Sequence, residues 1–371
     1  MNDVRSRPRV TVSAVKARLL SVLAGLVLAA FGAGGLLSGG VAPATGATAE
    51  PACGAATPRV VDAIDDRVAH EIFDQELMSS EVTADLAHIT SSTALSAAVA
   101  SGDQAQIRAA THAIVYTPVW HIVRLRVLST SGQLLADVGG PYILAPVSGQ
   151  ISYQGSVVGS FVMSVQDDRG YEKLVSRIVG VPIEEYLHGK PLMGTLKSPP
   201  PNPPVSGPLT LGGTNYSVDA YSLSAYPSGS LQIAVFVPTP TAPLDAMSCQ
   251  QVRLETNAGV VDNIAIGLTL SGHYIYANQR LFVSQAYGYV HLPVFIFKGA
   301  HEAYGTDRLA GAGAPAPGHL PKSGDVSYNG STWLVAAIRP YPPDWIYVLE
   351  PASGSASAGR IGPTSGTGDS Q

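Results

Sequence analysis

The sequence is short of the features that mark a nucleic-acid-binding protein or a helical bundle. Only 13% of the 371 residues are charged, the formal net charge is -5, and no basic run occurs beyond the first twenty residues. A phosphate-binding surface needs clustered Lys and Arg, so we expect no nucleic-acid partner. The scarcity of charge, together with 39 Gly and 28 Pro, favours short strands and many turns over long solvated helices.

The signatures of several large enzyme classes are also missing. The sequence has no GxSxG nucleophile elbow, no HExxH zinc motif, no Walker loop, and no GxGxxG after a predicted strand. The pair His301-Glu302 lacks the second histidine of a metal motif, and the nine histidines are scattered along the chain. We therefore expect no enzyme, no cofactor and no metal site. The two carboxylates of a glycosidase can be far apart in sequence and form no local motif, so this class of enzyme is not excluded.

Cysteine is nearly absent: the chain has only Cys53 and Cys249. Two thiols so far apart in sequence exclude a CxxC zinc site and a CxxC redox motif. A single disulfide is the simplest interpretation, and it would stabilise the fold by roughly 4 to 5 kcal/mol in an oxidising compartment. Two unrelated free thiols are the alternative.

The N-terminal segment is predicted to direct the chain out of the cytoplasm. Basic residues gather in the first eighteen positions, and residues 19–49 carry no charge. The apolar run Leu19 to Leu37 exceeds an ordinary signal-peptide core and approaches the length of a membrane span. Residues 1–49 are therefore either a signal peptide, with a small-residue cleavage site at Ala47 to Ala49, or a retained membrane anchor. The rest of the chain faces outward in both cases.

Helical periodicity dominates the next part of the chain. Apolar residues recur every four positions from Val60, which predicts a helix beginning just after Thr57-Pro58. Further helix is expected to about Val115. Gly102 followed by Asp103 predicts a helix end and a capped restart, so the helical region has at least two pieces.

The apolar period changes to two after His121, which predicts strands. Ser131-Gly132 and Gln154-Gly155 lie between alternating segments and predict the turns of two hairpins. A short helix is expected over residues 170–179. Helix, hairpin, hairpin and helix predict an α+β module with an antiparallel sheet.

An internal repeat follows. Residues 181–238 predict a strand, a proline-rich loop, a hairpin and a final strand, and residues 292–351 show the same order. Cys53 and Cys249 each precede a helix that contains the sequence Val-Val-Asp. We therefore expect the two segments to share one strand order, and a disulfide between the helix starts would hold the two modules together.

These patterns predict four regions. Residues 1–49 form the signal peptide or anchor, and residues 50–240 form a first module. Residues 247–351 form a second module, and residues 352–371, which have almost no bulky apolar side chain, form a disordered tail.

Three stretches resemble the extracytoplasmic Cache, or PAS-like, sensor domains of bacteria: SGDQAQIRAATHAI, HIVRLRVLSTSGQLLADVGGPY and GSVVGSFVMSVQDD. The resemblance implies an α+β fold in which long N-terminal helices pack on antiparallel PAS-like sheets, with a small-molecule pocket on one sheet face. It is clearest over residues 58–238 and rests on the internal repeat beyond residue 249. The chain departs from typical receptors of this family, because we find no second apolar span and no kinase, cyclase or methyl-accepting output domain.

The candidate ligand-binding residues begin on the first predicted strand. Arg124 and Arg126 lie two positions apart and so point to the same side of the strand. They either form an exposed polar face or bind a carboxylate or phosphate of a small ligand through paired hydrogen bonds. Asp137 either caps the following Gly-Gly turn or assists an arginine, and Tyr142 would lie at the pocket mouth.

Asp167 and Asp168 complete the candidate site. They end a predicted strand just before the short helix, so capping that helix is their simplest role. A cation site is the alternative, but calcium needs six to eight oxygen ligands and no EF-hand spacing is present.

The sequence favours an extracytoplasmic small-molecule-binding protein of sensor type, without catalytic or output domain of its own. Its ligand would be a carboxylate or an amino acid, its contact with the membrane would come from a retained N-terminal segment, and a signal would need a separate partner. The alternatives are a structural or adhesive envelope protein and a hydrolase with an unrecognised site. A pocket lined by Arg and Tyr, a flat apolar patch, or a cleft of carboxylates would distinguish the three.

Overall fold

The computed structural model describes residues 50–239, 241–270, 275–299, 301–309, 316–340 and 345–352. The predicted export segment, Leu19 to Leu37, and residues 353–371 of the predicted tail lie outside this range. Among the described residues, no helix is both long enough and apolar enough to cross a membrane. The chain divides after residue 49, and the fold described below belongs to the second unit, residues 50–371.

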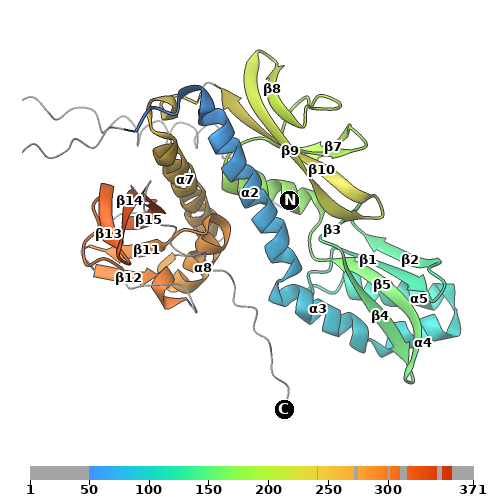
Figure 1. Cartoon of the computed structure of the whole chain (residues 1–371). Helices are drawn as coiled ribbons and strands as arrows, with labels where there is room; N and C mark the ends of the chain where they lie inside the picture. The colour runs from blue at the N-terminus through green and yellow to red at the C-terminus, as the bar shows by residue number, and fades with distance from the viewer. Residues whose placement is uncertain are drawn as a thin grey trace, which may run out of the picture. The chain divides into compact units, whose positions relative to one another are not determined.

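Antiparallel sheets and helices build the described part of the chain, which confirms the predicted α+β class (Figure 1). The first sheet has four strands in the order β2-β1-β5-β4. Its strands are β1 (Arg124–Ser129), β2 (Leu134–Gly139), β4 (Val147–Tyr153) and β5 (Ser156–Ser164). The two predicted hairpins are β1-β2 and β4-β5.

The second sheet has the order β3-β9-β10-β6-β7, and β8 also pairs with β9. Its strands are β3 (Ile143–Leu144), β6 (Ile183–Leu187), β7 (Lys190–Gly194), β8 (Ser206–Leu211), β9 (Thr214–Tyr226) and β10 (Gly229–Thr239). The third sheet has the order β12-β11-β15-β14-β13. Its strands are β11 (Val294–Lys298), β12 (His301–Gly305), β13 (Ser323–Tyr328), β14 (Ser331–Ile338) and β15 (Trp345–Pro351).

The second and third sheets are two copies of one arrangement, which confirms the predicted repeat. The order β7-β6-β10-β9-β8 in one corresponds strand by strand to β12-β11-β15-β14-β13 in the other. Two helices precede each copy. They are α2 (Thr57–Leu77) and α6 (Asp168–Val179) in the first copy, and α7 (Cys249–Leu270) and α8 (Gln279–Val290) in the second.

The first sheet belongs to an insertion in the first copy. Residues 78–167 connect α2 to α6, whereas residues 271–278 connect α7 to α8 in the second copy. Residues 50–240, expected as one module, therefore carry two sheets. Alternation along a strand identifies its two faces but does not say which sheet it joins.

The inserted domain begins with three helices: α3 (Ser80–Ser91), α4 (Thr93–Ser101) and α5 (Gln104–Val115). Gly102 ends α4 in the left-handed conformation, with φ of 73°. The Asp103 carboxylate then caps α5 by accepting hydrogen bonds from the backbone amides of Ala105 and Gln106. The predicted break and capped restart are confirmed.

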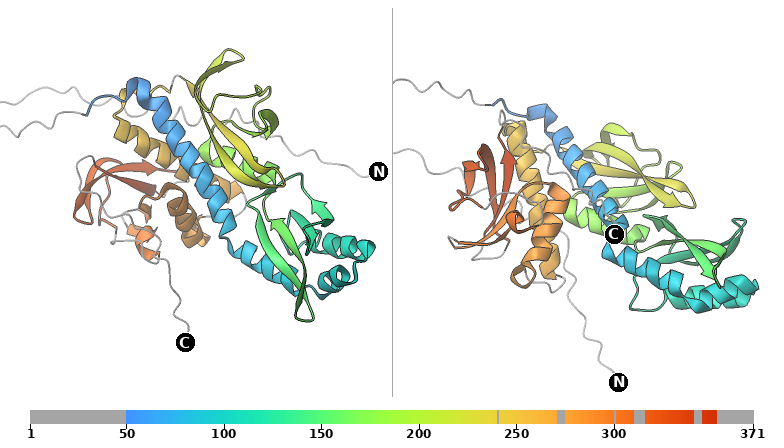
Figure 2. Two further views of the ribbon diagram at one scale, coloured as in Figure 1. Left: turned by 45° about the vertical axis from the view of Figure 1, so that its right-hand side comes forward. Right: turned by 60° about the horizontal axis from the view of Figure 1, so that its bottom comes forward.

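Two large hydrophobic cores hold the elements together. One lies within the inserted domain, between its helices and its sheet. The other is continuous through both copies of the repeat and includes Val68 of α2, Val175 of α6, Ile233 of β10, Val261 of α7 and Ile296 of β11. Helices α2 and α7 pack against each other in this core (Figures 1 and 2).

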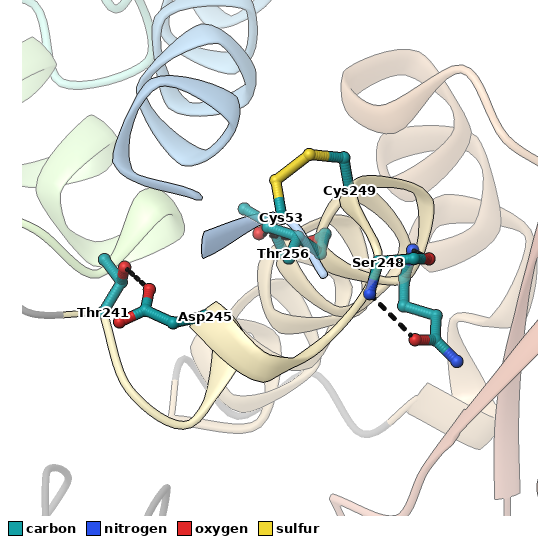
Figure 3. Close-up of a disulfide and its surroundings, with 8 residues drawn as sticks. Cys53, Thr241, Asp245, Ser248, Cys249 and Thr256 are labelled. Atoms are coloured by element: carbon teal, nitrogen blue, oxygen red, sulfur yellow. Dashed lines mark hydrogen bonds between the residues drawn. A yellow bond between two sulfur atoms is a disulfide. The ribbon is translucent and has the colours of Figure 1, made fainter. Parts of the chain in front are cut away.

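A disulfide joins the starts of the two repeat copies, as the sequence predicts (Figure 3). The Cα atoms of Cys53 and Cys249 are 4.6 Å apart, and 196 positions separate the two residues in sequence. The Cys53 amide also donates a hydrogen bond to the carbonyl of Met247, at 2.6 Å. Covalent and backbone bonds therefore fix the two helix starts side by side.

Candidate functional site

The candidate site lies on the face of the first sheet that points away from its helices. Leu125 and Val127 of β1 are fully buried in the core of the inserted domain. Arg124 and Arg126 alternate with them and therefore share the opposite face, as expected. Across the β1-β2 ladder, Arg126 is the register partner of Asp137.

Asp137 binds both arginines. Arg124 donates a parallel pair of hydrogen bonds, from Nε to Oδ1 at 2.8 Å and from Nη2 to Oδ2 at 2.7 Å. Arg126 Nε lies 3.3 Å from the same Oδ2. The side chains of Arg124 and Arg126 are only 12% and 11% exposed, so both guanidinium groups are largely removed from water.

Several guanidinium donors in this cluster lack a partner. Within the described residues, the buried Nη1 atoms of Arg124 and Arg126 have no hydrogen-bond partner, and the buried Nε of Arg126 has only its ion pair with Asp137. A buried donor without a partner costs about 1 to 3 kcal/mol, and more when it is charged. The site therefore has unsatisfied capacity for an anion.

Tyr226 supplies the aromatic part of the site. The Arg126 guanidinium carbon lies 4.7 Å from the centre of the Tyr226 ring. Tyr226 is the last residue of β9 in the second sheet, so the two arginines lie where the inserted domain meets the first repeat copy. Tyr142, expected at the pocket mouth, is half-buried in the segment between β2 and β3.

The Gly139-Gly140 turn closes tightly over the start of β1. Gly139 has φ of 117°, and a Cβ atom there would lie 2.1 Å from the Val123 carbonyl oxygen, so only glycine fits. A Cβ on Gly140 would lie 3.5 Å from the Cβ of Asp167. The turn thus brings Asp167 next to the arginine strand.

Asp167 and Asp168 have different environments. Asp167 accepts a hydrogen bond from the Gly170 amide at 2.6 Å and is the N-cap of α6, its simplest expected role. Asp168 is completely buried, and neither of its oxygens has a hydrogen-bond partner among the described residues. Burial and the charge of Asp167 raise the pKa of Asp168 to about 6, although Arg124 acts in the opposite direction.

Glu185 on β6 is a neighbour that the sequence did not reveal. It is completely buried, and among the described residues neither carboxyl oxygen has a partner. Burial raises its pKa to about 9, with further contributions from Asp168, Glu172, Asp167 and Glu184. Tyr226 was also missed by sequence analysis. Both residues lie on the second sheet, and no local sequence pattern connects them with β1.

The arrangement supplies charge and hydrogen-bond donors for binding a small anion. In the described part of the chain, no group of three or more His, Cys, Asp or Glu side chains is placed to hold a metal ion. The Arg124, Arg126 and Asp137 cluster instead has the paired geometry that arginine uses for carboxylates.

No family model matches the sequence, and no curated protein matches it. A solved structure with low similarity is the periplasmic domain of LuxQ from Vibrio cholerae, which is 12% identical with a TM-score of 0.27. That match covers 50% of this chain and 97% of the LuxQ chain.

Proposed function

We propose that the protein is an extracytoplasmic small-molecule-binding protein of sensor type, and that it holds a carboxylate or an amino acid at Arg124 and Arg126. The observation that carries the proposal is the set of buried guanidinium donors without partners on one sheet face. The resemblance of this segment to Cache domains supports the same role.

A ligand carboxylate would bind the free Nη1 atoms of Arg126 and Arg124. Charge-assisted hydrogen bonds of this kind contribute about 1.5 to 3 kcal/mol each. Asp137 would keep Arg124 in position, or would accept a hydrogen bond from the amino group of an amino-acid ligand. The second role would favour amino acids over simple carboxylates.

The position of the site suits a sensor. Arg126 contacts Tyr226 at the end of β9, and the charge of Arg124 lowers the pKa of Asp168 at the start of α6. A ligand bound to the arginines would change both interactions. It would therefore shift the populations of conformations in which the inserted domain and the first repeat copy are arranged differently. Transmission of that signal would need a separate partner protein.

The location is also part of the proposal. The Cys53–Cys249 disulfide supports an oxidising compartment outside the cytoplasm. Residues 1–49 would then act as a cleaved signal peptide or as a membrane anchor.

A thermal-shift screen tests the proposal. The purified protein is heated with sets of carboxylates, amino acids and uncharged metabolites at constant ionic strength. Ligands that bind the folded state raise the melting temperature by mass action. We expect carboxylates or amino acids to stabilise the wild type and the Arg108→Ala control, whose exposed side chain lies on α5, but to stabilise Arg126→Ala much less. Equal stabilisation of all three proteins would contradict the proposed site.

A further inference from the structure

A second polar cluster lies in the first repeat copy, where α2 packs on β9. Asp62, Asp66 and His70 are spaced four residues apart on α2, so they line one face of that helix. This face lies on the opposite side of α2 from the apolar stripe that begins at Val60.

Alternate residues of β9 face these helix side chains. Ser217 donates a hydrogen bond to Oδ2 of Asp62. The rings of His70 and Tyr221 have centroids 4.2 Å apart. Asp219 lies between Ser217 and Tyr221 on the same side of the strand. We call this group the acidic seam, and it consists of Asp62, Asp66, His70, Ser217, Asp219 and Tyr221.

Negative charge in the acidic seam is poorly compensated. Burial raises the pKa of Asp62 to about 6 against the hydrogen bond from Ser217, and the charges of Asp219 and Asp66 add to the effect. Burial also raises the pKa of Asp66 to about 6, where His70 lowers it and Asp219 raises it. The guanidinium of Arg67 instead binds the Tyr289 carbonyl and Asn257 Oδ1.

Two carboxylate oxygens in the seam lack hydrogen-bond partners. Asp62 is only 3% exposed, and its Oδ1 is buried without a partner among the described residues, as is Oδ1 of Asp66. Asp66, Asp219 and Tyr221 are half-buried, so the seam has a side that faces solvent. Unpaired buried acceptors beside half-buried acidic side chains indicate a missing donor with positive charge.

We propose that the acidic seam binds an organic cation with a primary ammonium group. An ammonium group has three N–H donors around one charge, which suits two or three carboxylates at irregular positions. A metal ion fits less well, because no described group of acidic or histidine side chains has metal-binding geometry. The Tyr221 ring would add a cation–π contact beside the carboxylates.

A cation bound in the seam would strengthen the contact between α2 and β9. This site has the opposite charge preference to the one at Arg126 and shares none of its residues, so either can exist without the other. The protein would then respond to an amine through the first repeat copy and to an anion through the inserted domain.

Calorimetric titration at pH 7.5 tests the proposal with methylamine, 1,4-diaminobutane, tetramethylammonium and NaCl at matched ionic strength. We expect saturable binding of the primary amines, and weaker binding of tetramethylammonium because it has no N–H donor. Asp66→Asn and Asp219→Asn should each weaken amine binding at least tenfold. Asp325→Asn, an exposed site on β13, is the matched control and should bind amines as the wild type does.

Two further variants keep the test decisive. Asp219→Lys would place an ammonium group in the seam from within the chain, so it should raise the melting temperature and abolish amine binding even if the asparagine variants fold poorly. Arg126→Ala should bind amines normally, which separates this site from the proposed anion site. The proposal is overturned if titration with the amines gives no more binding heat than titration with NaCl. It is also overturned if the melting temperature changes with pH but not with amine concentration.

Discussion

Arg124 and Asp137 form a bidentate ion pair across β1 and β2, with N···O distances of 2.8 and 2.7 Å. The pair is diagonal, since Arg124 has Gly139 as its register partner and Asp137 has Arg126. One carboxylate therefore pairs with two arginines, and it leaves the Nη1 atoms of Arg124 and Arg126 without a partner in the described structure. An external anion would complete the set.

Removal of Asp137 should produce a protein that anions rescue. Asp137→Ala leaves two largely buried guanidinium groups without their shared carboxylate, and we expect a loss of about 1 to 3 kcal/mol in the free energy of unfolding. Acetate or sulfate should restore part of it by occupying the vacated position. Urea unfolding with and without these salts measures the effect, with NaCl at equal ionic strength as the control. A loss that acetate does not reverse would mean that the arginines do not bind anions.

Asp167 should stabilise the protein by capping α6, and its negative charge should not be required. Asp167→Ala removes the N-cap of α6 and should lower the free energy of unfolding by about 1 kcal/mol, whereas Asp167→Asn retains capping and should be nearly neutral. Urea unfolding distinguishes the two variants. If Asn proves as destabilising as Ala, or abolishes ligand binding, then the carboxylate charge itself is required.

Reduction of the disulfide should weaken the fold strongly. Loop-closure entropy for a bond that spans 196 positions corresponds to about 5 kcal/mol. Urea unfolding of the wild type should shift to lower urea concentration when a reductant is added. The double variant Cys53→Ala, Cys249→Ala should already be destabilised and should not respond to reductant. A wild type that is indifferent to reductant would show that the thiols are not bonded in solution.

Acidification should stabilise the protein. The pKa values of Asp62, Asp66 and Asp168 are raised to about 6, that of Glu184 to about 7 and that of Glu185 to about 9, with burial as the largest cause in each case. The folded state then binds more protons than the unfolded state between about pH 4 and pH 9, so the free energy of unfolding falls as pH rises through this range.

Urea unfolding at pH 5 and pH 8 measures this dependence. We expect a higher midpoint at pH 5, and Glu185→Gln should raise the midpoint at pH 8 because it removes the most strongly shifted of these carboxylates. A protein equally stable at both pH values would show that these carboxylates are hydrated in solution.

The sequence predicted features that depend on neighbouring residues. The shared face of Arg124 and Arg126 followed from strand alternation, and the capped restart at Asp103 followed from local turn chemistry. The repeat was visible because both copies keep the same loops and strands in the same order. The number of sheets was not visible, because the insertion at residues 78–167 separates α2 from the sheet it covers.

The missed residues come from elements distant in sequence. Tyr226 and Glu185 reach the site from the second sheet, and no local period links them to β1. The acidic seam had a weak signal in the four-residue spacing of Asp62, Asp66 and His70. On its own that pattern describes a solvated helix face, and only the pairing with β9 shows that it is buried.

Binding of an anion at Arg126 is the central claim, and calorimetry tests it most directly. The dissociation constant of the best carboxylate or amino acid from the screen is measured for wild type, Arg126→Ala, Arg126→Lys and Arg108→Ala. We expect Arg126→Ala to bind at least tenfold more weakly, Arg126→Lys to lie between it and the wild type because a point charge lacks the paired donors, and Arg108→Ala to match the wild type. Equal affinity of Arg126→Ala and wild type would contradict the account.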